Sequence, residues 1–238
     1  MTPFDQKAAA CRCEWAATGH DFLAAADVVI VVDVLSFSTC VDIAAARGIA
    51  ILPYPWQDPR AAAFAAAQRA ELAGRRGDAR YSLSPASFVD APEGIRCVLP
   101  SPNGAALAFH AAGTSAAVLT GCLRNARAVA AAARRLGVTF NVCPAGEQWP
   151  DGSLRPAVED WLGAGAILCR LPGSKSPEAA AAVAAFHQAE HNIPTVLAST
   201  SSARELTARG FGVDVELAAH YDVSDCAPRL EHGAFVRA

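Results

Sequence analysis

The chain has 238 residues, of which 53% are hydrophobic and 18% charged, and its formal net charge is −3 at pH 7. This composition predicts a folded domain with a large core and excludes a disordered chain, while the lack of a lysine and arginine stripe argues against nucleic-acid binding. The same lack of a basic stripe makes a small ligand the expected partner. No apolar run is long enough to span a membrane, and the start MTPFDQKAAACRCEW lacks the apolar core of a signal peptide, so we expect a cytoplasmic protein.

Short aliphatic runs alternate along the chain with alanine-rich segments of helical period. The aliphatic runs predict strands over residues 28–32, 49–54, 96–99, 116–120, 138–143, 166–170 and 195–198, although the run at 166–170 also fits the continuation of a helix. Strands that alternate with helices predict a mostly parallel or mixed sheet covered on both faces. The expected fold is therefore a three-layer α/β/α sandwich, formed by residues 1–238 as a single domain.

The predicted helices begin at polar capping residues, some of them followed by proline. These starts are Asp58–Pro59, Asn125, Ser176–Pro177 and Ser201 or Ser202. Gly74 and Gly137 predict the ends of the first two helices. The stretch from Arg75 to Gly94 is long for a loop in a compact domain, which makes it a candidate lid.

In open parallel sheets the ligand binds beyond the carboxyl ends of the strands, so the residues after each predicted strand are candidate site residues. They are mostly hydroxyl-bearing side chains, glycines and helix starts: Asp33, Ser36, Ser38, Thr39, Ser101, Asn103, Gly104, Thr120, Gly121, Gly146, Glu147 and 199–202. Helix N-termini flanked by small residues bind anions, which predicts an anionic ligand. The alternative is that these residues are ordinary caps and turn formers.

Asp33 directly follows the most hydrophobic segment of the chain. A buried carboxylate needs a cation or hydrogen-bond donors, and Ser38, or Thr39 with Asp42, already suffices to cap the helix that follows. Asp33 is therefore expected to bind Mg²⁺, which takes one or two carboxylates and fills its other positions with water and phosphate oxygens. The other candidate acids are Glu147, Glu159 and Asp160.

The adjacent acids Glu159 and Asp160 fall in the same predicted helical turn. Neighbouring helical residues point about 100° apart, so one member of the pair is expected to face the site. The alternative is that both lie in a solvated first turn, where the helix dipole favours acids.

Several common catalytic motifs are absent from the chain. It has no G-x-G-x-x-G, no Walker loop and no G-x-S-x-G, and Leu35 stands where a D-x-D phosphatase motif has its second aspartate. His187 and His191 lie near a predicted helix C-terminus, where histidine is electrostatically favourable. The absence of those motifs disfavours nucleotide-binding and serine-hydrolase chemistries.

The eight cysteines form no C-x-x-C pair and are expected to be reduced.

Four ordered motifs resemble the 2-phosphosulfolactate phosphatase family, the ComB-like proteins. They read VVVDVLSFSTCVDIAAARGIA, VLPSPNGAALA, GCLRNARAVA and VCPAGEQWPDGSLRPAVEDWLGAGAIL, and SLSPAS in the long loop also matches. The resemblance runs from about Asp27 to Ala219. It implies an α/β/α sandwich and a Mg²⁺-dependent hydrolase that releases phosphate from 2-phospho-3-sulfolactate to give 3-sulfolactate in coenzyme M biosynthesis.

The residues and the resemblance together define the candidate site. The catalytic candidates are Asp33 and Glu147, and the candidate Mg²⁺ ligands are Asp33, Glu159 and Asp160. The candidate substrate-binding residues are Ser36, Ser38, Thr39, Asn103, Gly104, Asn125, Gly146 and Arg155. The expected partner is a small anionic phosphorylated substrate, with no nucleic acid and no membrane, and we allow for a homodimer.

Two positions depart from the family pattern. Ser36 stands where many members have arginine, and Arg75 stands where they have glutamate. Losing a cation from an anion pocket and an acid from a metal shell changes the substrate or abolishes turnover unless other residues compensate. The candidates for compensation are Arg76, Arg124 and Arg155. The rival hypotheses are a non-catalytic anion-binding or sensor protein of the same fold and a structural component of an oligomer.

Overall fold

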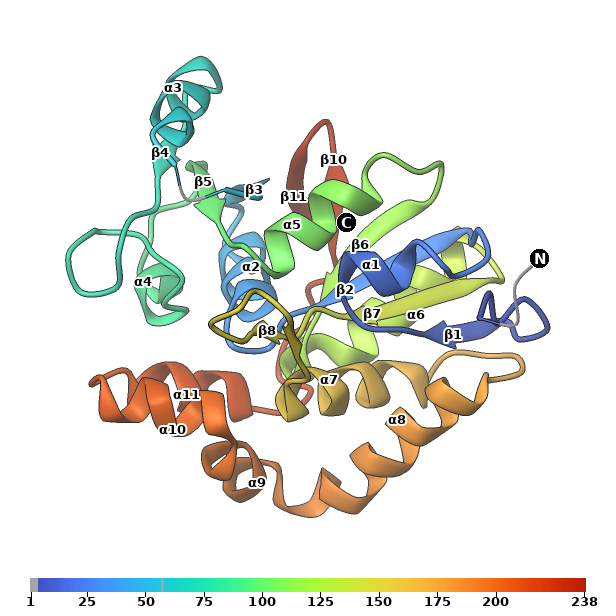
Figure 1. The fold of residues 1–238 in the computed structure, drawn as a ribbon. Helices are drawn as coiled ribbons and strands as arrows, with labels where there is room; N and C mark the ends of the chain where they lie inside the picture. The colour runs from blue at the N-terminus through green and yellow to red at the C-terminus, as the bar shows by residue number, and fades with distance from the viewer. Residues whose placement is uncertain (1–3, 57) are drawn as a thin grey trace.

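The computed structural model describes residues 4–56 and 58–238 and has a nine-stranded mixed sheet with helices on both faces (Figure 1). This is the three-layer α/β/α sandwich that the sequence predicts. In the order of the sheet, the strands are β1 (Cys11–Cys13), β7 (Phe140–Pro144), β2 (Val28–Val32), β6 (Ala117–Gly121), β10 (Pro228–Glu231), β11 (Ala234–Arg237), β3 (Ala50–Tyr54), β5 (Arg96–Pro100) and β4 (Glu71–Leu72). A separate hairpin consists of β8 (Glu147–Gln148) and β9 (Leu154–Arg155).

The sheet consists of two parallel groups joined by an antiparallel hairpin. Strands β1, β7, β2 and β6 are parallel to one another, and so are β3, β5 and β4. Between the groups, Arg229 of β10 pairs with Leu119 of β6, and Phe235 of β11 pairs with Ile51 of β3. No strand is predicted after residue 220, so this hairpin adds to the expected fold and makes the sheet mixed.

The helices cover both faces of the sheet. They are α1 (Ala16–His20), α2 (Phe37–Ala46), α3 (Arg60–Ala67), α4 (Ala86–Val89), α5 (Gly104–Ala111), α6 (Ala126–Leu136), α7 (Val158–Leu168), α8 (Pro177–Ala189), α9 (Ile193–Ser199), α10 (Ser201–Ala208) and α11 (Gly212–Ala219), with short 3₁₀ turns at Leu123–Asn125 and Glu190–Asn192. Within the two described ranges, no helix has the length and apolar character that a bilayer crossing requires.

The central strand β2 shows why the core has two halves. All five residues of its sequence VVIVV are buried, as in a parallel strand covered on both faces. Because side chains alternate along a strand, Val28, Ile30 and Val32 pack with α6, α7 and α8, whereas Val29 and Val31 pack with α2 and α5. Figure 1 shows α7 and α8 on one side of the sheet and α5 on the other.

Five of the predicted strands are confirmed within two residues at each end, and two predictions are wrong. Residues 166–170 continue α7 and 195–198 belong to α9. Both segments are short apolar runs, and periodicity alone does not distinguish a buried helix from a buried strand. In α7, Gly165 lies so close to the Ala182 carbonyl of α8 that a Cβ would overlap it, so the apolar run faces another helix instead of a neighbouring strand.

The helix starts are confirmed in part. Ser176 caps α8 by accepting the Ala179 N–H at 3.1 Å, but α10 is capped by Thr200 instead of Ser201 or Ser202. The helix predicted up to Gly74 ends at Ala67, because the chain then enters β4. Asn125 stands at the start of α6 without capping it.

The prediction for the start of α2 is also wrong. The helix begins at Phe37, so Thr39 and Asp42 lie inside it and form no capping box. The Thr39 Oγ1 donates to the Val34 carbonyl at 2.7 Å, and Asp42 forms an ion pair with Arg124 at 2.9 Å. The N–H groups at the start of α2 therefore bond neither Thr39 nor Asp42 and require a different acceptor.

Candidate functional site

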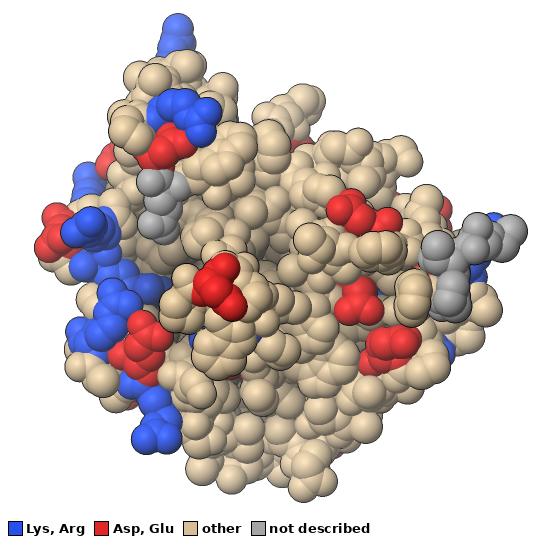
Figure 2. All heavy atoms as spheres, in the orientation of Figure 1, with Lys and Arg blue, Asp and Glu red and all other residues tan. Residues whose placement is uncertain are grey.

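A polar cavity of about 370 Å³ lies where the segments after β2, β5 and β7 meet. Its charged lining comprises three acids and three arginines: Asp33, Glu147, Glu205, Arg76, Arg155 and Arg209. A larger cavity of about 790 Å³ shares Arg76, Leu83 and Arg209 with it. Figure 2 shows blue spheres gathered on one side of the molecule, where Figure 1 places the segment between β4 and α4 and the ends of α10 and α11. The site thus holds both signs of charge.

Asp33, the first residue after β2, is the acceptor at the starts of two helices. Its Oδ1 accepts the Phe37 N–H of α2 at 3.1 Å, and its Oδ2 accepts the Gly104 N–H of α5 at 2.9 Å. The sequence-based expectation that no cap is required of Asp33 is therefore wrong. Burial nevertheless outweighs these donors and raises the Asp33 pKa to about 6. A carboxylate has about four lone-pair sites, so Asp33 retains capacity to bind a cation.

Gly104 is required at the start of α5 by this contact. A Cβ at this position would lie 2.5 Å from Asp33 Oδ2 and 2.7 Å from the Phe37 ring. Gly104 therefore acts on the site by allowing the helix to approach Asp33.

Glu147 borders the cavity from β8. Its Oε2 accepts the Asn103 Nδ2–H at 2.8 Å. Burial is the main cause that raises the Glu147 pKa to about 7, and the charge of Asp33 adds to it. The ionised Asp33 thus disfavours ionisation of Glu147 at the wall of the same cavity.

The two adjacent acids in the first turn of α7 have different surroundings. The Asp160 carboxylate accepts the Val34 N–H at 2.7 Å and the Gly146 N–H at 2.9 Å, and burial raises its pKa well above the usual value. Asp160 therefore joins the segments after β2 and β7 and, unlike Asp33, is not among the residues that line the cavity. Glu159 is 2% exposed, and its charge raises the pKa of both Asp33 and Glu147.

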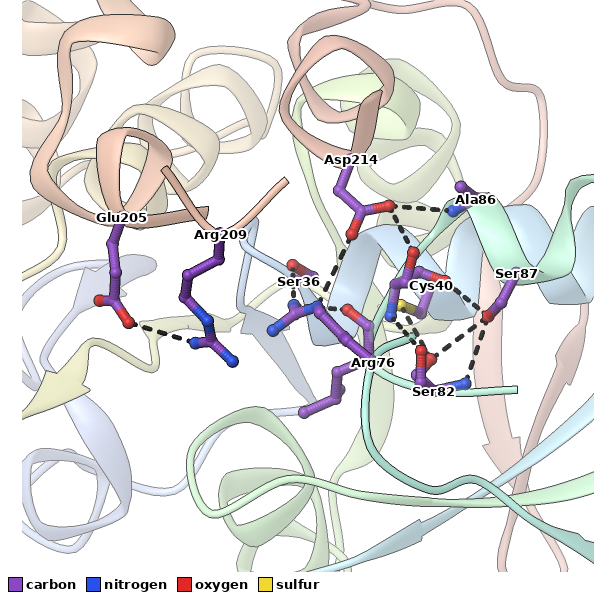
Figure 3. A network of polar contacts seen from close by, with 11 residues as sticks. Ser36, Cys40, Arg76, Ser82, Ala86, Ser87, Glu205, Arg209 and Asp214 are labelled. Carbon is purple, nitrogen blue, oxygen red and sulfur yellow. Dashed lines mark hydrogen bonds and ion pairs between the residues drawn. The ribbon is translucent and has the colours of Figure 1, made fainter. Parts of the chain in front are cut away.

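Arg76 enters the cavity from the segment between β4 and α4. Its Nη2 donates to Ser36 Oγ at 2.8 Å and to the Leu83 carbonyl at 2.5 Å, and its Nε lies 3.6 Å from Asp214 Oδ2. Figure 3 shows Arg76 between Ser36 and Asp214. The Arg76 guanidinium therefore lies beside the position where the family pattern has arginine.

Asp214 of α11 also holds the segment that carries Arg76. Its Oδ1 accepts the Ser84 hydroxyl at 2.6 Å and the Ala86 N–H at 3.2 Å. The candidate lid at residues 75–94 is thus tied to α11 at the start of α4.

The remaining arginines differ in their relation to the cavity. Arg155 of β9 donates to Ser202 Oγ at 3.1 Å and lies over the Trp149 ring. Arg209 forms an ion pair with Glu205 at 3.3 Å (Figure 3). Arg124, by contrast, binds Asp42 and lies outside the described cavity lining, so the structure does not support it as a compensating cation.

Four predicted substrate-binding residues hold the backbone instead of lining the cavity. Ser38 accepts the Asp33 N–H at 2.9 Å and bonds Thr120 Oγ1 at 2.7 Å. Thr39 bonds the Val34 carbonyl, as described above, and Asn125 Oδ1 accepts the Cys122 N–H at 2.9 Å. Ser38, Thr39 and Asn125 are fully buried, and Gly146 acts through its N–H to Asp160. Of the predicted substrate-binding set, the cavity is lined by Ser36, Asn103 and Arg155.

Helix α10 supplies cavity residues that the sequence analysis misses. Glu205, Leu206 and Arg209 line the cavity together with Ser202. The sequence predicts this helix from Ser201 or Ser202, but of its residues only those at its start, within 199–202, are counted among the site candidates. The spacing of Glu205 and Arg209, four residues apart, is the signal that one face of a helix carries both charges.

The cavity acids fit a hard divalent cation bound through few protein ligands. Among the described residues, three potential ligand atoms come within 4.8 Å of one another at His20, Asp21 and His110, away from this cavity. Mg²⁺ requires no such cluster, because it binds through one or two carboxylates plus water and substrate phosphate. Asp33 and Glu147 border the cavity, whereas Glu159 is buried, is not among the lining residues, and acts on both acids through its charge.

A family model described as 2-phosphosulpholactate phosphatase matches residues 17–233, nearly the full chain. No curated protein matches at a significant level. The matched range includes every residue that lines the cavity.

Proposed function

The chain belongs to the 2-phosphosulpholactate phosphatase family of phosphoric monoester hydrolases, and from this premise we propose that it is a Mg²⁺-dependent enzyme that hydrolyses the phosphomonoester of a small anionic hydroxy acid. By family, the proposed substrate is 2-phospho-3-sulfolactate, which with water yields 3-sulfolactate and phosphate. The observation that supports this proposal most directly is one cavity with carboxylates, Asp33 and Glu147, and arginines, Arg76, Arg155 and Arg209.

The carboxylates are assigned to the metal and the water. Asp33 and Glu159 would hold the ion, which supplies charge stabilisation to the phosphoryl oxygens when it is bound. Glu147 is assigned to orient the attacking water and accept its proton, because Asn103 engages its Oε2 and leaves Oε1 without a hydrogen bond in the described structure. Asp160 positions the loops that carry Asp33 and Glu147.

The arginines are assigned to the two anionic groups of the substrate. Phosphate and sulfonate or carboxylate oxygens accept forked hydrogen bonds from guanidinium groups. The N–H groups of Phe37 and Gly104 are engaged by Asp33, so the ends of α2 and α5 stabilise the acid instead of the substrate. Arg76 is the best-placed phosphate ligand, because it lines the cavity and its Nη2 bonds Ser36, the residue that stands where the family pattern has arginine.

Phosphate release from a panel of phosphorylated hydroxy acids, with and without Mg²⁺, tests this function. We expect Mg²⁺-dependent release that chelation removes and that Asp33→Asn reduces at least about 100-fold, as for loss of a group that stabilises charge in the transition state. Glu216→Gln, an exposed acid of α11, is the matched control and should retain activity. Tight binding of the same anions without any release would contradict the proposal and favour the anion-sensor hypothesis.

A further inference from the structure

A second group of potential metal ligands lies apart from the substrate cavity. His20 ends α1, Asp21 follows it, and His110 lies in the last turn of α5. These three residues line a cavity of about 230 Å³ that shares no lining residue with the substrate cavity. Side chains from two helices thus meet at one point.

The distances among these side chains match a shared ion. One potential ligand atom from each residue lies within 4.8 Å of the others, and His110 Nε2 lies 2.7 Å from Asp21 Oδ1. The rings of His20 and His110 are 5.6 Å apart and nearly perpendicular. Two imidazoles bound tetrahedrally to one zinc ion, at about 2.0–2.1 Å per bond, have ring centres roughly 5–5.5 Å apart. A small movement of the side chains therefore suffices for coordination.

His20 supplies an independent indication of a ligand. It is only 8% exposed, and its Nδ1 has no hydrogen-bond partner within residues 4–56 and 58–238. Buried polar atoms normally have a partner, so this nitrogen calls for one. Burial, followed by the neighbouring His110, lowers the His20 pKa, which favours the neutral imidazole that binds metals.

We propose that His20, Asp21 and His110 form a binding site for a divalent transition metal ion of the zinc type, separate from the Mg²⁺ and substrate site. Two imidazoles and one carboxylate select zinc-like ions over Mg²⁺, which prefers oxygen ligands. Three protein ligands beside a cavity leave the fourth position to water. The ion links α1 to α5, the helix whose first residue, Gly104, holds Asp33.

Zinc titration of the chelator-treated full chain, by calorimetry under reducing conditions, tests this proposal. We expect one site that His110→Ala and Asp21→Asn each weaken at least 10-fold. Both side chains are partly exposed, so these variants should fold. The matched control is His187→Ala, because His187 also lies in the last turn of a helix and also contacts an acid, Glu190, at 3.2 Å.

Two further measurements distinguish this site from zinc bound by cysteine thiolates and from a general divalent-cation site. Co²⁺ should give a tetrahedral d–d spectrum without thiolate charge transfer, since the site contains no cysteine, and Mg²⁺ at the same concentration should not displace zinc. Unchanged zinc affinity in His110→Ala, equal weakening in His187→Ala, a thiolate band, or displacement of zinc by Mg²⁺ would each overturn the proposal. None of these measurements requires turnover, so they stand or fall independently of the phosphatase activity.

Discussion

Replacing Glu147 by glutamine should stabilise the metal-free protein at alkaline pH while it removes activity. Burial and the charge of Asp33 raise the Glu147 pKa from 4.5 to about 7. A shift of about 2.5 pKa units corresponds to about 3 kcal/mol of lost stability once the carboxyl is ionised in both states. The side chain is partly exposed, which reduces the expected gain for Glu147→Gln to about 2 kcal/mol.

The stability gain from Glu147→Gln should increase as the pH rises. Below pH 4.5 the carboxyl is protonated in the folded and the unfolded chain, so ionisation costs no stability. Between pH 4.5 and about 7 the unfolded chain releases the proton first, so the free energy of unfolding falls as pH rises, and above about 7 the full penalty is present. Glutamine does not titrate. The advantage of the variant should therefore grow from near zero at pH 4.5 to about 2 kcal/mol at pH 8.

Urea denaturation in the presence of EDTA, at pH 5, 6, 7 and 8, measures this difference. In a thermal unfolding experiment on a chain of this length, the same difference of about 2 kcal/mol corresponds to a shift of roughly 4–8 °C in Tm. Glutamine retains an oxygen to accept the Asn103 amide, so the hydrogen bond at 2.8 Å need not be lost. Glu216→Gln controls for the loss of one charge. A stability difference that does not change with pH, or a variant less stable than the parent at pH 8, would refute the reasoning.

Two other substitutions test the geometry of the site. Gly104→Ala should lower the free energy of unfolding by about 1–3 kcal/mol and reduce phosphatase activity, because the new Cβ overlaps Asp33 Oδ2. Thermal unfolding and an activity assay check this prediction. An unchanged Tm with full activity would contradict it. Arg76→Ala should weaken binding of inorganic phosphate about 10- to 100-fold, the value of a hydrogen bond to a charged group, with partial recovery in Arg76→Lys. Calorimetry measures the affinity, with the exposed residue Arg134→Ala as the control. Equal affinity in Arg76→Ala would exclude Arg76 as a phosphate ligand.

Both the successes and the failures of the sequence analysis have local causes. The run VVIVV is so apolar and so short that a buried strand is the natural assignment, and its neighbours β6 and β7 follow from the same pattern. The apolar runs in α7 and α9 have similar composition but pack against helices. The strands β10 and β11 make one register pair each with the rest of the sheet, and nothing in their own residues indicates that they join its two halves.

The sequence by itself determined the alternating strands and helices, the family, and the presence of acids in the loops after β2 and β7. Only the tertiary structure decided what each acid does. The carboxylate of Asp160 is engaged by the N–H of Val34, 126 residues away, whereas the charge of its neighbour Glu159 raises the pKa of Asp33 and Glu147. The physical reason is that a buried charge is governed by which donors and charges surround it, and those come from segments far apart in the chain.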